Sequence, residues 1–218
     1  MSDRQNVLFV TIDQFRADCL FGALGDYVKL PNLRALMQDG VSFTQHFSVC
    51  APCGPSRASI LTGQYAMNHR AVRNGTPLRR DTLNLATEVR KGGYLPLLFG
   101  YTDSAQDPRG MHPNDPALGT YEEVMPGFHE VLRMRMEDDI GPWRTDLVAK
   151  GYDVPPFPDI YRPNGDQIDD PAIYSAQDSD TAFMADAVIK DLAARPEGWF
   201  AHVTFLRPHP PFVAPAPY

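Results

Sequence analysis

The sequence predicts an α/β fold, in which a central and mostly parallel sheet carries helices on both faces. The first observation is a set of short, continuous apolar runs, at residues 6–12, 95–101 and 199–206. Such runs are typical of strands that are buried on both faces of a parallel sheet. The second observation is a set of segments with helical spacing, at residues 31–39, 83–91 and 178–194. Strands that alternate with helices indicate an α/β layered fold.

Local signals support these elements and add two more. The helices at 31–39 and 83–91 are both followed by glycine, a common helix stop. We also expect a strand at 41–47, where apolar residues alternate, and a short helix at 59–63.

Residues 127–177 carry Pro, Gly, Asp and Met without a regular period. We predict that this range is a loop-rich insertion over the sheet rather than a separate domain. The 21 prolines are about twice the usual share and lie mostly in the second half, which agrees with a loop-rich region there.

Composition and charge exclude some classes of function. A hydrophobic fraction of 43% in 218 residues is ordinary for a globular protein and allows a sizeable core. The net charge of −7 argues against binding to nucleic acid, which needs clustered Lys and Arg. It does not exclude a small anionic substrate, because a few local arginines outweigh the global charge at a site.

The sequence shows no membrane or export signal. No stretch approaches the roughly 20 apolar residues that span a bilayer, and the first apolar run is too short for a signal peptide. The cysteines Cys19, Cys50 and Cys53 form no even disulfide set, which agrees with a reducing compartment. We therefore predict a cytoplasmic protein with no membrane partner.

The segment from Cys50 to Gly63 is the most informative and reads Cys-Ala-Pro-Cys-Gly-Pro-Ser-Arg-Ala-Ser-Ile-Leu-Thr-Gly. Its Cys-x-x-Cys pair has three interpretations from the residues alone: a redox site, half of a zinc site, or two buried thiols in a loop. A redox pair is expected to open a helix that contains few prolines. A zinc site needs further ligands, and Cys19 has no histidine beside it.

A fourth interpretation comes from a family resemblance. Residues 53–57, Cys-Gly-Pro-Ser-Arg, resemble the Cys-x-Pro-Ser-Arg signature of the sulfatases, and the following Ala-Ser-Ile-Leu-Thr-Gly continues the likeness. Residues 65–74, 100–102 and 207–212 resemble the phosphonate monoester hydrolase branch of the alkaline phosphatase superfamily. The resemblance implies that residues 1–218 are the N-terminal portion of a single sulfatase-like catalytic domain. It implies metal-dependent hydrolysis of phosphonate monoesters and phosphodiesters, with sulfate esters as a side activity.

The resemblance also implies the chemistry of Cys53. In the family, a formylglycine-generating enzyme or another sulfatase-maturation enzyme oxidises this cysteine to formylglycine. One hydroxyl of the hydrated aldehyde, acidified by a divalent cation, attacks phosphorus or sulfur. The second hydroxyl, once deprotonated, expels the product. A serine or an unmodified cysteine would perform only the first half of this reaction.

One divalent cation is implied as a cofactor: calcium, manganese or zinc. Asp13 ends the first predicted strand, at the sheet edge where ligands bind in α/β folds. Position by position, the resemblance makes Asp13 and the processed Cys53 ligands of the cation. Gln14 stands at a third ligand position, where many sulfatases have a second aspartate. This departure lowers the negative charge at the metal and resembles the phosphonate monoester hydrolases.

Four further residues match catalytic or substrate-binding positions of the family. Arg57 would hold the aldehyde hydrate or the substrate anion through bidentate contacts. Asn74 and Tyr101 match substrate-contacting positions, and His209 is a candidate proton donor to the leaving group. Three of them have a structural alternative: Arg57 as a salt-bridged arginine, Tyr101 as a core residue and His209 as a packed loop residue. Asp13 has one too, as a cap of the turn after the strand.

Two features limit what the resemblance implies. Asp103 stands where the branch has a small hydroxyl residue, and its carboxylate would repel a doubly charged substrate. The family completes its metal site with an Asp-His-Gly segment, which does not occur in these 218 residues, and with a lysine further along. We therefore predict that the chain is about the first two-fifths of a longer protein and that alone it binds metal weakly and is inactive. A homo-oligomer is expected for the full-length protein.

Two other functions remain as alternatives. The first is a true arylsulfatase, against which Gln14 argues. The second is a non-catalytic, sulfatase-like binding module in which Cys53 stays a thiol. The intact maturation signature argues against such a module.

Overall fold

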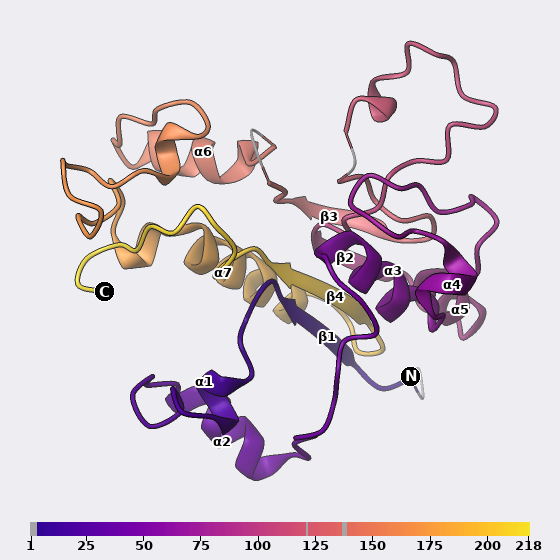
Figure 1. Cartoon of the computed structure of the whole chain (residues 1–218), viewed down its shortest axis with the longest axis horizontal. Helices are drawn as coiled ribbons and strands as arrows, with labels where there is room; N and C mark the ends of the chain where they lie inside the picture. The colour runs from indigo at the N-terminus through magenta and orange to yellow at the C-terminus, as the bar shows by residue number, and fades with distance from the viewer. Residues whose placement is uncertain (1–3, 121, 137–138) are drawn as a thin grey trace.

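The computed structural model describes residues 4–120, 122–136 and 139–218, and it has the predicted α/β architecture (Figure 1). Its strands form a sheet in the order β1 (Val7–Ile12), β4 (Phe200–Phe205), β2 (Pro96–Gly100) and β3 (His129–Arg133). Each pair of neighbours is parallel, so the carboxyl ends of the strands meet at one edge of the sheet.

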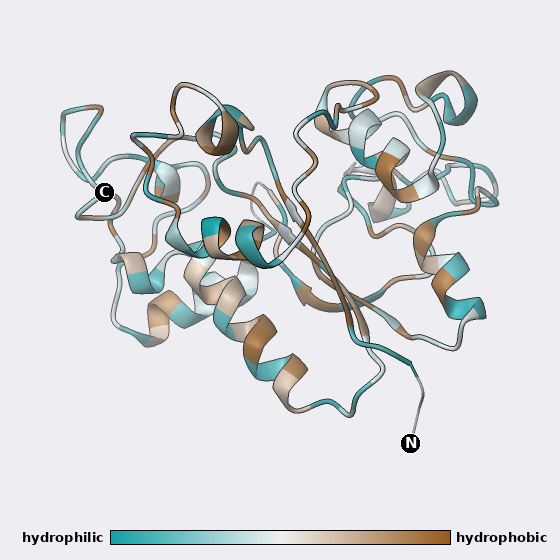
Figure 2. Cartoon of the chain, turned by 90° about the horizontal axis from the view of Figure 1, so that it is seen from below, coloured by the Kyte–Doolittle hydropathy of each residue, from teal (hydrophilic) through white to brown (hydrophobic). Residues whose placement is uncertain are grey.

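Helices cover both faces of this sheet, because side chains alternate along each strand. On one face, Leu97 and Phe99 of β2 join a core cluster with residues of α6 and α7. On the other face, Leu98 joins a second cluster with residues of α3 and α5. The strands are among the most hydrophobic parts of the chain (Figure 2). The helices concerned are α3 (Cys53–Thr62), α5 (Leu85–Lys91), α6 (Gly141–Ala149) and α7 (Asp180–Ala193).

The remaining elements are short. They are α1 (Asp18–Phe21), α2 (Pro31–Asp39), α4 (Ala66–His69) and the 3-10 helices η1 (Pro116–Leu118), η2 (Asp159–Tyr161) and η3 (Ala176–Asp178). In Figure 1, α1 and α2 lie together, away from the sheet. Among the described residues, no helix has both the length and the apolar character needed to cross a membrane.

Side-chain caps set the starts of two predicted helices. α5 begins after Asn84, whose Oδ1 accepts a hydrogen bond from the backbone N–H of Thr87 at 3.1 Å. α7 begins after Ser179, whose Oγ accepts from the backbone N–H of Ala182 at 3.2 Å. Each cap satisfies a backbone donor that the first turn leaves unpaired, which fixes the start more closely than apolar spacing does.

The helix predicted at 59–63 is longer than expected and begins at Cys53. Pro55 stands in its first turn, where a missing backbone N–H removes no helical hydrogen bond. Gly63 ends the helix in the left-handed region, with φ of 66°, and its N–H bonds to the Ser59 carbonyl at 2.9 Å. Cys53 is therefore the first residue of a helix rather than part of a loop.

Two predictions about strands are wrong. Residues 41–47 form no strand, because no neighbouring strand pairs with them in the described structure, and Phe43 is 75% exposed. The first strand was expected to be buried on both faces, but β1 lies at the edge of the described sheet, with Leu8 52% exposed. β4 covers only one side of β1.

The range 127–177, predicted to be a loop-rich insertion, contains β3 of the sheet and the helix α6. Trp143 and Leu147 of α6 are fully buried in the core cluster with β2 and β4. Its status as an insertion, and the assignment of residues 1–218 to a single catalytic domain, stay predictions.

Candidate active site

The carboxyl edge of the sheet brings Asp13 and Tyr101 together, although they are 88 residues apart in the chain. Asp13 follows β1, and its backbone N–H continues the ladder to the Phe205 carbonyl at 3.0 Å. Tyr101 follows β2 and is almost fully buried. Its hydroxyl donates to Asp13 Oδ2 at 2.6 Å. Parallel strands thus place the ends of two predicted elements at one point.

Arg57, from the second turn of α3, completes a triangle with these two residues. Its Nη2 donates to Asp13 Oδ2 at 2.9 Å and to the Tyr101 hydroxyl at 3.1 Å. The guanidinium also lies over the Tyr101 ring, 4.4 Å from the centroid. All three side chains are buried, so the ion pair is shielded from solvent.

Burial and pairing set the charges in this triangle. Burial acts to lower the pKa of Arg57, but its neighbours Tyr101 and Asp13 outweigh this effect and raise it, so the guanidinium stays charged. Burial raises the pKa of Tyr101 far above its usual value. The phenol therefore keeps its proton and remains the donor to Asp13.

Two threonines, one in β1 and one in β4, also contact the Arg57 guanidinium. Its Nη1 lies 3.5 Å from the hydroxyls of Thr11 and Thr204, which are 3.1 Å from each other. Thr204 is in turn 3.2 Å from Nε2 of His202, a fully buried histidine of β4. Burial lowers the pKa of His202 to about 4, so this ring is neutral near pH 7. His202 is therefore a buried core histidine rather than a site residue.

Asn74 holds Cys53 at the start of α3. Its side-chain nitrogen donates to the Cys53 Sγ at 3.1 Å, and its oxygen accepts from the backbone N–H of Gly54 at 3.0 Å. A Cβ atom at position 54 would lie only 3.0 Å from that oxygen, so glycine keeps this contact open. Asn74 thus caps α3 from a distant loop and fixes its first side chain.

Asp103 is 6% exposed and lies against Cys53. Among the described residues, its buried carboxylate has no hydrogen-bonding neighbour other than the Cys53 thiol. Burial raises the pKa of Asp103. Burial and the neighbouring Asp103 carboxylate together raise the pKa of Cys53 to about 11. The Cys53 thiol is therefore protonated near pH 7.

Two predicted site residues lie outside this cluster. Gln14 is exposed, with a backbone φ of 58°. His209 lines an open pocket of about 590 Å³ together with Phe212 and Tyr218. The charge of His209 nevertheless reaches Asp103 and acts to lower the pKa of that carboxyl.

The loop of His209 is fixed by Arg207. The Arg207 Nε donates to Asp180 at 3.1 Å, and its Nη1 donates to the carbonyls of His209 and Pro211 at 2.6 and 2.7 Å. The His209 Nδ1 lies 2.7 Å from the Pro210 carbonyl. This contact requires a proton on Nδ1 and leaves Nε2 as the other reactive nitrogen.

Comparison with known proteins assigns the chain to a family. The family profile described as Sulfatase matches residues 5–218. The chain belongs to the sulfatase family. This membership agrees with the Cys-Gly-Pro-Ser-Arg segment, whose cysteine and arginine both face the sheet edge described above.

Sulfatase-family relatives match nearly the whole chain. The solved phosphonate monoester hydrolase of Silicibacter pomeroyi is 60% identical, with a TM-score of 0.94, over 99% of this chain and 44% of its own. That of Agrobacterium radiobacter is 48% identical, with a TM-score of 0.93, over 99% and 43%. The multifunctional alkaline phosphatase superfamily protein PehA of Trinickia caryophylli is 40% identical over 99% and 44%. The chain thus spans less than half the length of these relatives.

Sulfatase-family members use a divalent cation, and part of the donor set in this chain fits one. Asp13 supplies an acidic oxygen within electrostatic reach of Cys53. Within the described ranges, however, no three His, Cys, Asp or Glu side chains are arranged to hold a metal ion. Asp13 Oδ2 instead accepts bonds from Arg57 and Tyr101.

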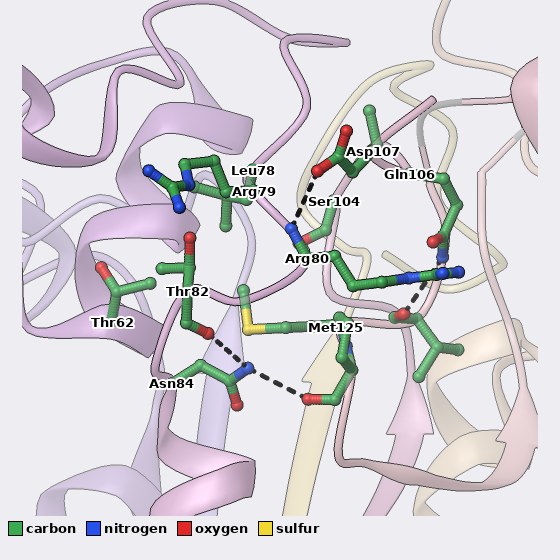
Figure 3. A pocket seen from close by; sticks show the side chains of 13 residues that line it. Thr62, Leu78, Arg79, Arg80, Thr82, Asn84, Ser104, Gln106, Asp107 and Met125 are labelled. Carbon is green, nitrogen blue, oxygen red and sulfur yellow. Dashed lines mark hydrogen bonds between the residues drawn. The ribbon is translucent and has the colours of Figure 1, made fainter. Parts of the chain in front are cut away.

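A separate small cavity is lined by Thr62, Asn84 and Met125, among other residues (Figure 3). Its volume is about 20 Å³, close to that of a single water molecule. Its polar groups are engaged with one another: Asn84 donates to the Pro126 carbonyl, and Asp107 accepts from the Arg80 backbone N–H at 3.0 Å. This space is too small for an ester substrate.

Proposed function

We propose that this chain is the N-terminal part of a metal-dependent enzyme that hydrolyses phosphonate monoesters and phosphodiesters, with sulfate esters as a further substrate class. The observation that carries the proposal is the group of buried polar side chains at the start of α3. There Cys53 lies within charge range of Asp13, whose partner is Arg57. The 60% identity to a phosphonate monoester hydrolase supports the substrate class.

The environment of Cys53 supports its conversion to formylglycine. A cysteine nucleophile needs a lowered pKa, because the thiolate is the reactive form. Here burial and Asp103 raise the pKa of the thiol to about 11. The site therefore disfavours thiolate chemistry and agrees with a residue that is oxidised before it acts.

The side chains around position 53 have separate roles in this proposal. Asn74 orients the nucleophile, since it already donates to the side chain of residue 53 and caps its helix. Arg57 and Tyr101 both donate to Asp13 Oδ2 and so hold this carboxylate at the site. His209 protonates the leaving group from Nε2, because its Nδ1 is held by a carbonyl.

A bound divalent cation would acidify the nucleophilic hydroxyl and offset the substrate charge. Asp13, Gln14 and the processed Cys53 are the residues of this chain that would hold it. Gln14 is exposed next to Asp13, whose carboxylate is already at the site. The ligands that complete the family's metal site are expected from a later segment of the polypeptide.

The test compares rates on an aryl phosphonate monoester, an aryl phosphodiester and an aryl sulfate. It uses matured polypeptide of the relatives' length, with the isolated 218-residue chain alongside. We expect the phosphonate and phosphodiester rates to exceed the sulfate rate, to vanish on chelation, and to vanish in Cys53→Ala. Sulfate turnover that dominates the other two would identify an arylsulfatase instead. Metal-dependent turnover by the isolated chain would contradict its predicted inactivity.

Three further predictions accompany this function. A formylglycine-generating or other maturation enzyme acts on residues 53–57, the full-length protein is a homo-oligomer, and it resides in the cytoplasm. An unmodified Cys53 thiol in inactive full-length protein would favour the binding module instead.

A further inference from the structure

Asp103 is the least compensated charged group near Cys53. Both of its oxygens are buried, and in the part of the chain that the structure describes they have no hydrogen-bonding neighbour other than the weakly donating Cys53 thiol. A buried carboxylate without a strong donor is uncommon, because desolvation of the charge is costly when no donor replaces the lost water. Its presence at a reactive side chain therefore calls for a functional reason.

The local backbone explains why Asp103 turns toward the site. Its φ is 52°, in the left-handed region that aspartate and asparagine adopt more readily than most residues. Its carbonyl oxygen lies 3.6 Å from the place that a Cβ on Gly54 would take, so the segment after β2 lies against the start of α3. The carboxylate itself contacts the thiol of Cys53, the first residue of α3.

The nearby positive charges do not neutralise this carboxylate by direct contact. Arg57 and His209 both act on the pKa of Asp103 through their charge. The hydrogen bonds of Arg57 go to Asp13 and Tyr101 instead, and Arg207 holds the loop of His209. An anion bound at Cys53 would therefore be repelled by the negative charge of Asp103, because few protein atoms would lie between them.

We propose that Asp103 makes this site select singly charged oxyanions over doubly charged ones. The inference rests on the proposed function and deepens it. Phosphonate monoesters, phosphodiesters and sulfate esters carry one negative charge, whereas phosphate monoesters carry two above neutral pH. A second charge a few ångströms from the carboxylate adds a repulsion worth roughly tenfold or more in affinity at an effective dielectric constant of about 20.

The test measures binding rather than turnover. Full-length protein with Cys53 left as a thiol is titrated at pH 8.5 with phenylphosphonate, a dianion, and with its monomethyl ester, a monoanion. Binding of each is followed by phosphorus NMR in the wild type and in Asp103→Asn. Asparagine keeps the shape and tolerates the left-handed backbone, and Asp103→Gly serves as a second variant at the same φ.

The matched control is Asp81→Asn, which removes one negative charge from an exposed pair with Arg79. We expect Asp103→Asn and Asp103→Gly to strengthen dianion binding at least about tenfold relative to monoanion binding. Asp81→Asn should leave the ratio of the two affinities unchanged.

The outcomes separate this inference from the function it rests on. An affinity ratio that stays the same in both Asp103 variants, while both anions bind, would overturn the role of Asp103 alone. An equal loss of both anions in the variants would make Asp103 a structural residue and overturn the inference as well. Failure of either anion to bind to any of the proteins would contradict the proposed anion site itself.

Discussion

Asp13 and Asp103 follow β1 and β2, the two strands that flank β4, and the contacts of the two carboxylates differ. Both side chains are buried, at 9% and 6% exposure, and both lie within charge range of Cys53. Asp13 accepts from Arg57 and Tyr101, whereas the carboxylate of Asp103 has no hydrogen-bonding neighbour among the described residues other than the Cys53 thiol. The two aspartates are thus buried to a similar extent but differ in role. Asp13 holds Arg57 and Tyr101 in place, whereas the charge of Asp103 is available to act on a bound anion.

The largest expected difference between the two aspartates is in the free energy of unfolding. Asp13→Asn removes the buried partner of Arg57, so we expect a loss of about 3–5 kcal/mol in the free energy of unfolding at pH 7. Asp103→Asn removes a charge that has no strong donor, and we expect no loss or a gain of about 1 kcal/mol. Urea denaturation of both variants measures the two values. A similar loss in both would show that Asp103 has a partner like that of Asp13.

A smaller effect isolates one bond of the Asp13 region. Tyr101→Phe keeps the ring under Arg57 but removes the hydroxyl that donates to Asp13, which costs about 1–2 kcal/mol in the free energy of unfolding. The matched control is Tyr94→Phe, whose hydroxyl bonds to the exposed Gln5 carbonyl at 3.0 Å and should matter little. Equal losses in the two variants would mean that the buried bond adds nothing.

The reactivity of the Cys53 thiol tests how strongly the charge of Asp103 acts on its neighbour. Because burial and Asp103 raise the pKa of the thiol to about 11, its alkylation by iodoacetamide should keep rising with pH up to at least pH 9.5. In Asp103→Asn, the rise should level off about one pH unit lower. The measurement follows mass labelling of unmatured protein in a Cys50→Ser background. A plateau below pH 9 in that background without the Asp103 change would contradict the raised pKa.

The smallest effect concerns an ion pair far from both carboxylates. Arg79→Met breaks the exposed pair with Asp81, whose side chains are 69% and 68% exposed. Such pairs contribute about 0.2–1 kcal/mol, so the midpoint of urea unfolding should hardly move. A loss comparable to that of Asp13→Asn would mean that burial does not decide the strength of these pairs.

The sequence predicted the layered fold because continuous apolar runs identify strands that lie inside a sheet. It failed at residues 41–47, where alternation without a neighbouring strand produces no ladder. It also placed β1 inside the sheet, although β1 is an edge strand of the described chain and Leu8 is half exposed. A local pattern shows what a segment could bury, and only the tertiary structure shows what covers it.

The motifs identified Asp13, Cys53, Arg57, Asn74 and Tyr101 as one site, and the structure brings these five side chains to the start of α3. Their catalytic roles stay predictions. The bonds among them could not be predicted, because the Arg57–Asp13 pair joins residues from separate elements 44 positions apart. The lack of a strong donor to Asp103 was equally hidden, since it depends on where Arg57 and Arg207 direct their donors.

The chemical state of residue 53 decides whether this protein uses a formylglycine nucleophile. The measurement is the mass of the tryptic peptide that spans residues 35–57, from full-length protein made in its own host. We predict that Cys53 has lost its sulfur and gained an aldehyde, which a hydrazide traps. An unmodified thiol at position 53 in protein that actively hydrolyses phosphonate esters would contradict it.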